Sequence, residues 1–333
     1  MIPTEKSEAV ARGLYEAFGV RAFDSIAPVT GGHTASLVFR LVVGGSAYLL
    51  KIIARAEDPT RHYTSMRAAA DAGVAPRVWH TNTEERISIT DFVDATSLSR
   101  ADALAKLPVL LRTLHALPPF GRAPFNTTCT FLLDRGPSVD GFLEKFRAAN
   151  LLPPQMSDEF WTAHTALAKA LPRDEAELAS CHNDLFKPDN ILFDGERVWL
   201  VDWEAAFLND RYADLAVVAN QIVANDEEEA AFLQAYLGAV PDARQHARLY
   251  VMRQLAHLFY TMAFLYTAGP GEPVDWNTPA PDDFAFQQLM WSGGADLSVR
   301  DVKIAFARVN WERLQHNLRQ PRYREALAIV GNL

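Results

Sequence analysis

The feature that most constrains the fold is a polar loop followed at once by a short apolar hairpin. The loop begins at Cys181 as Cys-His-Asn-Asp-Leu-Phe-Lys-Pro-Asp-Asn and carries a carboxylate at Asp184 and an amide at Asn190. Residues 191–201 are two apolar runs separated by Asp-Gly-Glu-Arg, and the carboxylate of Asp202 follows. A polar turn between two apolar runs predicts a β-hairpin. Asp184 and Asp202 are therefore expected at opposite flanks of one hairpin.

Three oxygen-bearing side chains close together beside one hairpin suit the transfer of a phosphoryl group. This reaction has a loose transition state, so a protein mainly positions the acceptor hydroxyl and holds Mg²⁺ against the phosphates. Mg²⁺ prefers carboxylate, amide and phosphate oxygens. We therefore predict that Asp184 orients the acceptor hydroxyl and accepts its proton, and that Asn190 and Asp202 bind Mg²⁺. Turn and capping roles are the alternative for isolated Asp and Asn residues, but the ordered spacing favours the chemical interpretation.

The segment resembles the catalytic and metal-binding loops of the aminoglycoside phosphotransferase and choline kinase superfamily, relatives of the protein kinases. Its Cys-His-Asn-Asp is more similar to the choline and ethanolamine kinase branch, because the antibiotic kinases usually have Gly between His and Asp. Residues 209–216, Asn-Asp-Arg-Tyr-Ala-Asp-Leu-Ala, resemble the stretch after the metal-binding Asp. The resemblance implies ATP and Mg²⁺ as cofactors. It also implies that Asp214 receives backbone N–H groups of the catalytic loop, whereas a helix cap is its plainer role. His182 is predicted to hold the loop by hydrogen bonds within it.

One departure from the family pattern concerns the metal-binding amide. The pattern places four residues between the Asp and the Asn, but five lie between Asp184 and Asn190. Either the loop bulges and delivers Asn190, or Asp189 takes the ligand position. We favour Asn190, because it directly precedes Ile-Leu-Phe as the family's Asn precedes its strand.

Residues 1–93 are predicted to form an N-lobe built on an antiparallel sheet. Two β-rich runs, 37–43 and 47–53, flank the hairpin signal Gly44-Gly45. By resemblance, Gly31 and Gly32 would belong to the loop that covers the phosphates, and Lys51 would be the strand lysine that contacts them.

The helix expected over residues 59–72 departs from the kinase pattern. In kinases this helix carries a Glu that pairs with the strand lysine, but no acid occurs from residue 60 to residue 70. Glu57 and Asp58, at the helix start, are the nearest candidates. Farther on, Asp91, Phe92 and Val93 resemble the hinge whose backbone binds adenine, although a plain edge strand would look the same.

Residues 94–333 are predicted to form a larger C-lobe with the catalytic and metal-binding loops and the substrate site. Apolar periodicity predicts helices over residues 107–117, 142–147, 160–171, 216–223, 230–237, 243–266 and 299–318. Residues 269–283, rich in Pro, Gly and Asp, are expected to be a loop. The fold class is thus α+β, a two-lobe protein-kinase-like fold with a small antiparallel-sheet N-lobe and a mostly helical C-lobe.

Charge and cysteine content exclude several functions. A net charge of -9 and a pI of about 5.5 argue against a nucleic-acid partner. The only two cysteines, Cys129 and Cys181, indicate neither a disulfide framework nor a zinc site. The amino terminus lacks a signal pattern, and the apolar stretch near 258–268 is too short to cross a bilayer. A cytoplasmic location without a membrane partner is expected, and the oligomeric state stays open.

The acceptor is the least constrained element. We predict an ATP- and Mg²⁺-dependent kinase for a small-molecule alcohol, for which a cationic one such as choline or ethanolamine is the first candidate. Glu204 could face the metal or such a cation, and a solvated strand-end acid is its alternative. An antibiotic phosphotransferase is the second candidate, favoured if the acidic run 226–229 lines the cleft. A nucleotide-binding pseudokinase is the alternative of another class, motivated by the extra loop residue and the missing helix Glu.

Overall fold

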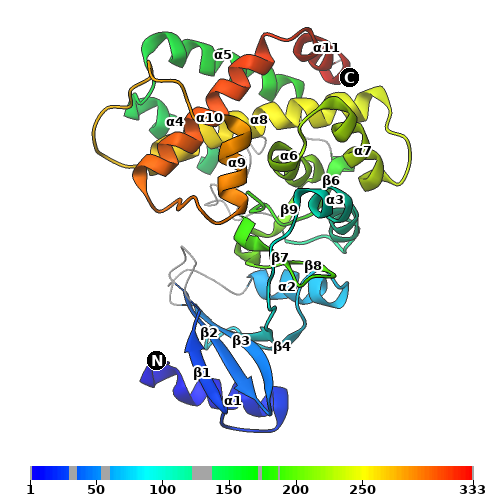
Figure 1. The fold of residues 1–333 in the computed structure, drawn as a ribbon, viewed down its shortest axis with the longest axis vertical. Coiled ribbons are helices and arrows are strands. Elements are labelled where there is room, and N and C mark those ends of the chain that lie inside the picture. The colour runs from blue at the N-terminus through cyan, green and yellow to red at the C-terminus, as the bar shows by residue number, and fades with distance from the viewer. Residues whose placement is uncertain are drawn as a thin grey trace.

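The computed structural model describes residues 2–29, 36–53, 61–121, 137–171, 175–186 and 188–331. An antiparallel sheet occupies one end of the molecule and helices form most of the other, with the two termini at opposite ends (Figure 1). The predicted α+β class is confirmed. Among the described residues, no helix is both long enough and apolar enough to span a bilayer.

The described strands are β1 (Ser25–Pro28), β2 (Ser36–Val43), β3 (Ser46–Ile53), β4 (Val78–Asn82), β5 (Ile87–Asp91), β6 (Leu178–Cys181), β7 (Ile191–Phe193), β8 (Val198–Leu200) and β9 (Phe207–Asp210). The described α-helices are α1 (Ser7–Phe18), α2 (Arg61–Asp71), α3 (Arg100–His115), α4 (Pro137–Ala149), α5 (Pro154–Ala170), α6 (Arg211–Ile222), α7 (Asp226–Leu237), α8 (Ala243–Thr267), α9 (Asp283–Trp291), α10 (Arg300–Leu318) and α11 (Pro321–Gly331). Short 3-10 helices are η1 (Thr4–Lys6), η2 (Glu175–Glu177), η3 (Pro188–Asn190) and η4 (Trp203–Ala205).

The amino-terminal sheet is antiparallel in the order β1-β2-β3-β5-β4. Gly44 and Gly45 turn the chain between β2 and β3 with φ values of 58° and 79°, a left-handed region that glycine enters without steric cost. The predicted hairpin is therefore confirmed. Lys51 lies on the central strand β3, opposite Val38 on one side and Ser88 on the other. This register fixes the lysine in the middle of the sheet.

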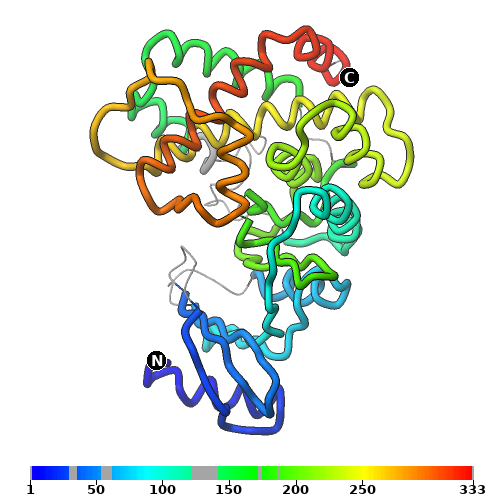
Figure 2. The backbone as a smooth tube through the Cα atoms, viewed as in Figure 1, coloured from blue at the N-terminus to red at the C-terminus, as the bar shows by residue number. Residues whose placement is uncertain are grey.

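The hairpin predicted around residues 191–201 is also confirmed, as β7 and β8. Its turn is fixed by Asp194, whose carboxylate accepts hydrogen bonds from the N–H of Glu196 (2.9 Å), the N–H of Arg197 (2.7 Å) and Trp199 Nε1 (2.7 Å). Figure 2 shows this segment in the middle of the molecule, between the amino-terminal strands and the long carboxy-terminal helices. The expectation of a C-lobe that is helical beyond this hairpin is incomplete, because β6 pairs with β9 in a second two-stranded sheet.

The helical part is organised around α8, which is buried along most of its length and packs against α5, α6, α10 and α11. Helices α9 and α11 were not predicted. The Asp282 carboxylate caps α9 by accepting from the N–H of Ala285 (2.9 Å), which ends the loop expected over 269–283. We keep a lobe boundary after residue 93 as a proposal, since β5 ends at Asp91 and the chain then crosses to α3.

Candidate active site

The strand lysine lies between two carboxylates that follow β8. Lys51 Nζ is 2.8 Å from Asp202 Oδ1 and 2.8 Å from Glu204 Oε1. Burial by itself would lower the pKa of Lys51, but the adjacent Asp202 and Glu204 carboxylates outweigh it and raise that pKa. The lysine is therefore a fixed positive charge beside the predicted metal-binding carboxylate.

Helix α2 packs against η4, which carries Glu204. Tyr63, from α2, is buried there and its hydroxyl has no hydrogen-bond partner. Burial, and then the charge of Glu204, raise the pKa of Tyr63. The helix that carries an acid for the strand lysine in kinases thus presents a neutral phenol to this region here.

Asp184 and Asn190 are in direct contact. Asn190 Nδ2 donates to the Asp184 backbone oxygen at 2.7 Å and to Asp184 Oδ2 at 3.0 Å. These bonds leave Asn190 Oδ1 as the side-chain atom suited to a cation. Asn190 is buried whereas Asp189 is exposed. The geometry therefore favours Asn190 over Asp189 as a ligand.

Two contacts connect this loop to the segment that carries Asp202. The N–H of Val201 donates to the Asn190 backbone oxygen at 3.0 Å. His182 Nε2 lies 2.9 Å from the Val201 carbonyl, and its ring packs 4.8 Å from the Trp203 ring, centroid to centroid. The prediction that His182 bonds within its own loop is thus wrong: its ring bonds across to the strand end, because the loop turns that ring toward Val201. The residue still couples the two loops.

Asp214 binds the backbone of the loop that carries Asp184. Its two carboxylate oxygens accept the N–H groups of His182 and Asn183, each at 2.8 Å, and Oδ2 is 3.2 Å from His115 Nε2. Its side chain is only 1% exposed. Burial would raise the pKa of Asp214, but the bond from His115 and the neighbouring histidines and N–H groups hold it below the usual value. A charged, fully engaged acceptor thus fixes the residues just before Asp184.

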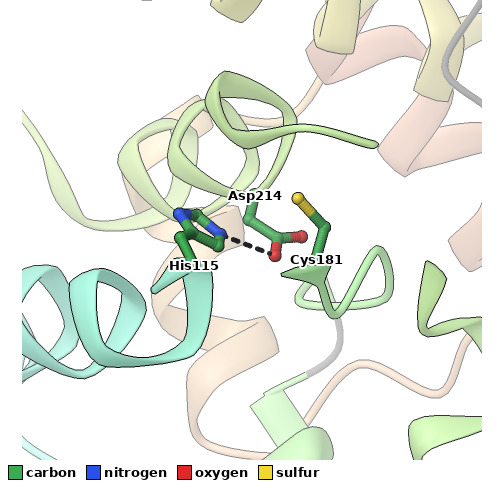
Figure 3. A group of neighbouring side chains, drawn as sticks. All are labelled: His115, Cys181 and Asp214. Carbon is green, nitrogen blue, oxygen red and sulfur yellow. Dashed lines mark hydrogen bonds and ion pairs between the residues drawn. The ribbon is translucent and has the colours of Figure 1, made fainter. Parts of the chain in front are cut away.

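His115, Cys181 and Asp214 form a buried cluster that could be mistaken for a metal site (Figure 3). Burial, first of all, raises the pKa of the Cys181 thiol well above its usual value. Metal binding uses the thiolate, and this thiol instead approaches the carbonyls of residues 209 and 210. His115 Nδ1 is 2.9 Å from the Tyr236 hydroxyl. Hydrogen bonding therefore explains the cluster without a metal.

Asn183 and His115 are structural contributors that the sequence reasoning missed. Asn183 adopts φ 64°, and its Nδ2 donates to the carbonyl of Ala205 at 3.1 Å while its Oδ1 accepts from Asn209 Nδ2 at 2.7 Å. Asn tolerates this left-handed conformation better than most residues. The signal was present, since the related antibiotic kinases usually carry Gly at this position. His115 lies in the last turn of α3, and no pattern in the sequence connects it to Asp214.

Residues 91–93, predicted to bind adenine through their backbone, begin at the last residue of β5. The Asp91 carboxylate accepts a hydrogen bond from Trp79 Nε1 at 2.6 Å. The N–H of Thr96 then donates to the carbonyl of Phe193, at the end of β7, also at 2.6 Å. The segment therefore joins the sheet to the catalytic hairpin, while its contact with adenine stays a prediction.

The remaining candidates differ in how far the structure places them. Gly31, Gly32, Glu57 and Asp58 lie outside the described residues. The acidic run 226–229 is placed, and three of its four acids form ion pairs within the chain: Asp226 and Glu229 both pair with Arg322, Glu229 also pairs with Arg253, and Glu228 pairs with Arg100. The contacts of the run therefore do not support its role as the lining of a substrate cleft.

Sequence comparison identifies the family of the chain. The sequence model of the phosphotransferase enzyme family matches residues 25–250, more than half of the chain. The chain belongs to this family. The match contains Lys51, the catalytic loop, Asp202 and Asp214, so the superfamily resemblance and the prediction of a phosphotransferase are confirmed.

The individual relatives of this phosphotransferase either match a short segment or have low sequence identity. Protein LicA of Haemophilus influenzae is 36% identical over 62 residues, and the match covers only 19% of this chain and 23% of that protein. A choline/ethanolamine kinase family protein from Mesorhizobium loti has a similar fold, with a TM-score of 0.63, 22% identity and coverage of 98% of this chain and 99% of that one. A spectinomycin phosphotransferase in complex with ADP and spectinomycin gives a TM-score of 0.51, 16% identity and coverage of 91% and 98%. The kinase-like fold is thereby confirmed.

Proposed function

We propose that this phosphotransferase moves the γ-phosphoryl group of ATP to a hydroxyl of a small molecule, with Mg²⁺ as the metal. The observation that carries the proposal is the pairing of side chains at two loops held together: Asp184 with Asn190, and Asp202 with Lys51. This set offers one carboxylate for the acceptor, oxygen donors for a hard cation and an ammonium for phosphates. The donor types fit the two cofactors.

In this scheme each residue has a separate task. The Asp184 carboxylate orients the acceptor hydroxyl and takes its proton as the oxygen attacks. Asn190 Oδ1 and the Asp202 carboxylate would hold Mg²⁺, which when bound neutralises charge on the phosphates. Lys51 contacts the phosphates as a point charge, and Asp214 keeps the catalytic loop in place. The backbone of residues 91–93 would bind adenine.

For the acceptor, we propose an amino alcohol of the choline or ethanolamine type. Cys-His-Asn-Asp supports it, as does the similarity in fold to a choline/ethanolamine kinase family protein. The antibiotic alternative loses its main argument, because the acidic run pairs with arginines of the same chain. The pseudokinase alternative is weakened too, since Lys51 has carboxylate partners without a helix Glu. We also propose the cytoplasm as the location, where ATP is supplied.

The test is ADP release with Mg²⁺ and ATP across choline, ethanolamine, spectinomycin and several aminoglycosides. We expect choline or ethanolamine to stimulate turnover, and Asp184→Asn to reduce kcat by about 10²- to 10⁴-fold, the usual contribution of a general base. Nucleotide affinity of this variant, measured by calorimetry, should stay within twofold of the wild type. Stimulation by an antibiotic alone would reassign the acceptor, and ATP binding without any turnover would favour the pseudokinase.

A further inference from the structure

Lys51 is mostly buried between the carboxylates of Asp202 and Glu204. The lysine side chain is only 15% exposed and contacts Asp202 and Glu204 at the same distance, 2.8 Å. A mostly buried ammonium needs a charged partner, because its own desolvation is costly. If Asp202 binds a divalent cation, its carboxylate is drawn toward that cation. The lysine then needs a second carboxylate to stay in position.

Helix α2 does not supply this carboxylate from its described residues. Its sequence from Arg61 to Asp71 contains a single acid, Asp71, which is exposed in the last turn. Glu57 and Asp58 lie outside the described residues, and among the described residues Lys51 forms ion pairs with Asp202 and Glu204. Within the part of the chain that the structure describes, both acids that contact Lys51 thus come from the segment after β8.

Glu204 lies on a rigid base suited to that task. Its neighbour Trp203 is 2% exposed, and its indole Nε1 donates to the Leu200 carbonyl at 3.2 Å. The N–H of Ala206 closes the η4 turn by donating to the Trp203 carbonyl at 3.0 Å. Helix α2 also packs against η4. A carboxylate on such a turn loses little further freedom when it holds an ammonium.

We propose that Glu204 is the positioning residue of Lys51, and that it keeps the ammonium aimed at the phosphates while Asp202 is engaged by the metal. It takes the place of the acid that kinases carry on the helix after the strand lysine. The inference rests on the proposed function, since it assumes that a metal-bound nucleotide occupies this site. The inference predicts that Glu204 strengthens nucleotide binding only when both the metal and the Lys51 ammonium are present.

The test is a double-mutant cycle with Glu204→Gln, Lys51→Met and the double variant, using calorimetric titration with ATP in EDTA and with ATP in Mg²⁺. We expect Glu204→Gln to weaken binding of Mg²⁺-ATP by about tenfold, the scale of one charge-assisted hydrogen bond, and binding in EDTA by less than twofold. In the Lys51→Met background, Glu204→Gln should weaken binding of Mg²⁺-ATP by less than twofold. Glu227→Gln, at an exposed acid, is the matched control.

Two results would overturn the inference. A tenfold loss that persists in Lys51→Met would assign Glu204 to the metal or the acceptor, and a loss below twofold in the single variant would leave it no role. A wild-type chain that binds no nucleotide would instead refute the proposed function, and the inference with it. If Glu204→Gln does not fold, Glu204→Asp replaces it in the cycle, because it keeps the charge and withdraws it from Lys51 by one methylene.

Discussion

Replacing Asp214 with Asn separates two explanations of this buried acid. A helix cap in the first turn of α6 is worth about 1 kcal/mol. The structure predicts more, because the carboxylate accepts two backbone N–H groups at 2.8 Å and a histidine nitrogen at 3.2 Å while 1% exposed. Asn keeps the shape but turns an NH₂ group toward one of these donors. Losing one charge-assisted bond and leaving one buried donor unpaired costs about 3 kcal/mol together.

Urea unfolding followed by tryptophan fluorescence measures this cost, and Trp203, in contact with His182, reports on the loop itself. The same variant should lower kcat by about 10²-fold, because a small displacement of the catalytic loop misplaces Asp184. Nucleotide affinity should change little, since Asp214 contacts the loop and not Lys51. The matched control is Asp301→Asn, in the first turn of α10, whose side chain is 89% exposed; we expect under about 0.5 kcal/mol there. A cost near 1 kcal/mol with unchanged kcat would refute the reasoning and leave only a cap.

Two further predictions concern conformation and pH. Asn183 has φ 64°, so Asn183→Ala should cost about 1 kcal/mol more stability than Asn183→Gly, measured by urea unfolding; equal costs would show that the conformation is unimportant. Burial, chiefly, lowers the pKa of His257 to about 3, so the folded chain keeps this ring neutral while the unfolded chain protonates it below pH 6.5. As the pH is lowered from 6.5 to about 3, this residue should therefore reduce the free energy of unfolding by about 1.4 kcal/mol per pH unit. His257→Leu should flatten the slope of unfolding free energy against pH in that interval; an unchanged slope would contradict the assignment.

Local signals explain which parts of the fold could be predicted. The Gly44-Gly45 hairpin and the hairpin of β7 and β8 are encoded within a few residues each, by turn chemistry between apolar runs. Long helices such as α8 and α10 follow from apolar periodicity. Helix α9 was missed because a Pro- and Gly-rich loop precedes it and only the cap at Asp282 marks its start.

Contacts between distant segments explain the rest. Lys51 and Asp202 are 151 positions apart, and His115 and Asp214 are 99 positions apart. Nothing in the residues near Lys51 indicates Glu204 as a partner, because this contact depends on how the sheet faces the catalytic hairpin. For the same reason the pairing of β6 with β9 was not foreseen. The sequence motif identified the reacting groups, and the topology decides which of them meet.

Two residues of the candidate active site, Asn183 and Asp202, have a strained backbone conformation. Asn183 and Asp202 each have φ 64°, a conformation that costs a non-glycine residue about 1–3 kcal/mol. One precedes Asp184 and the other is the predicted metal ligand. Glycine at position 202 would relieve the strain, but it would also remove the carboxylate that pairs with Lys51 and is the predicted metal ligand. The strain therefore supports a site for a metal-bound nucleotide, and the turnover assay decides between catalysis and a regulatory pseudokinase.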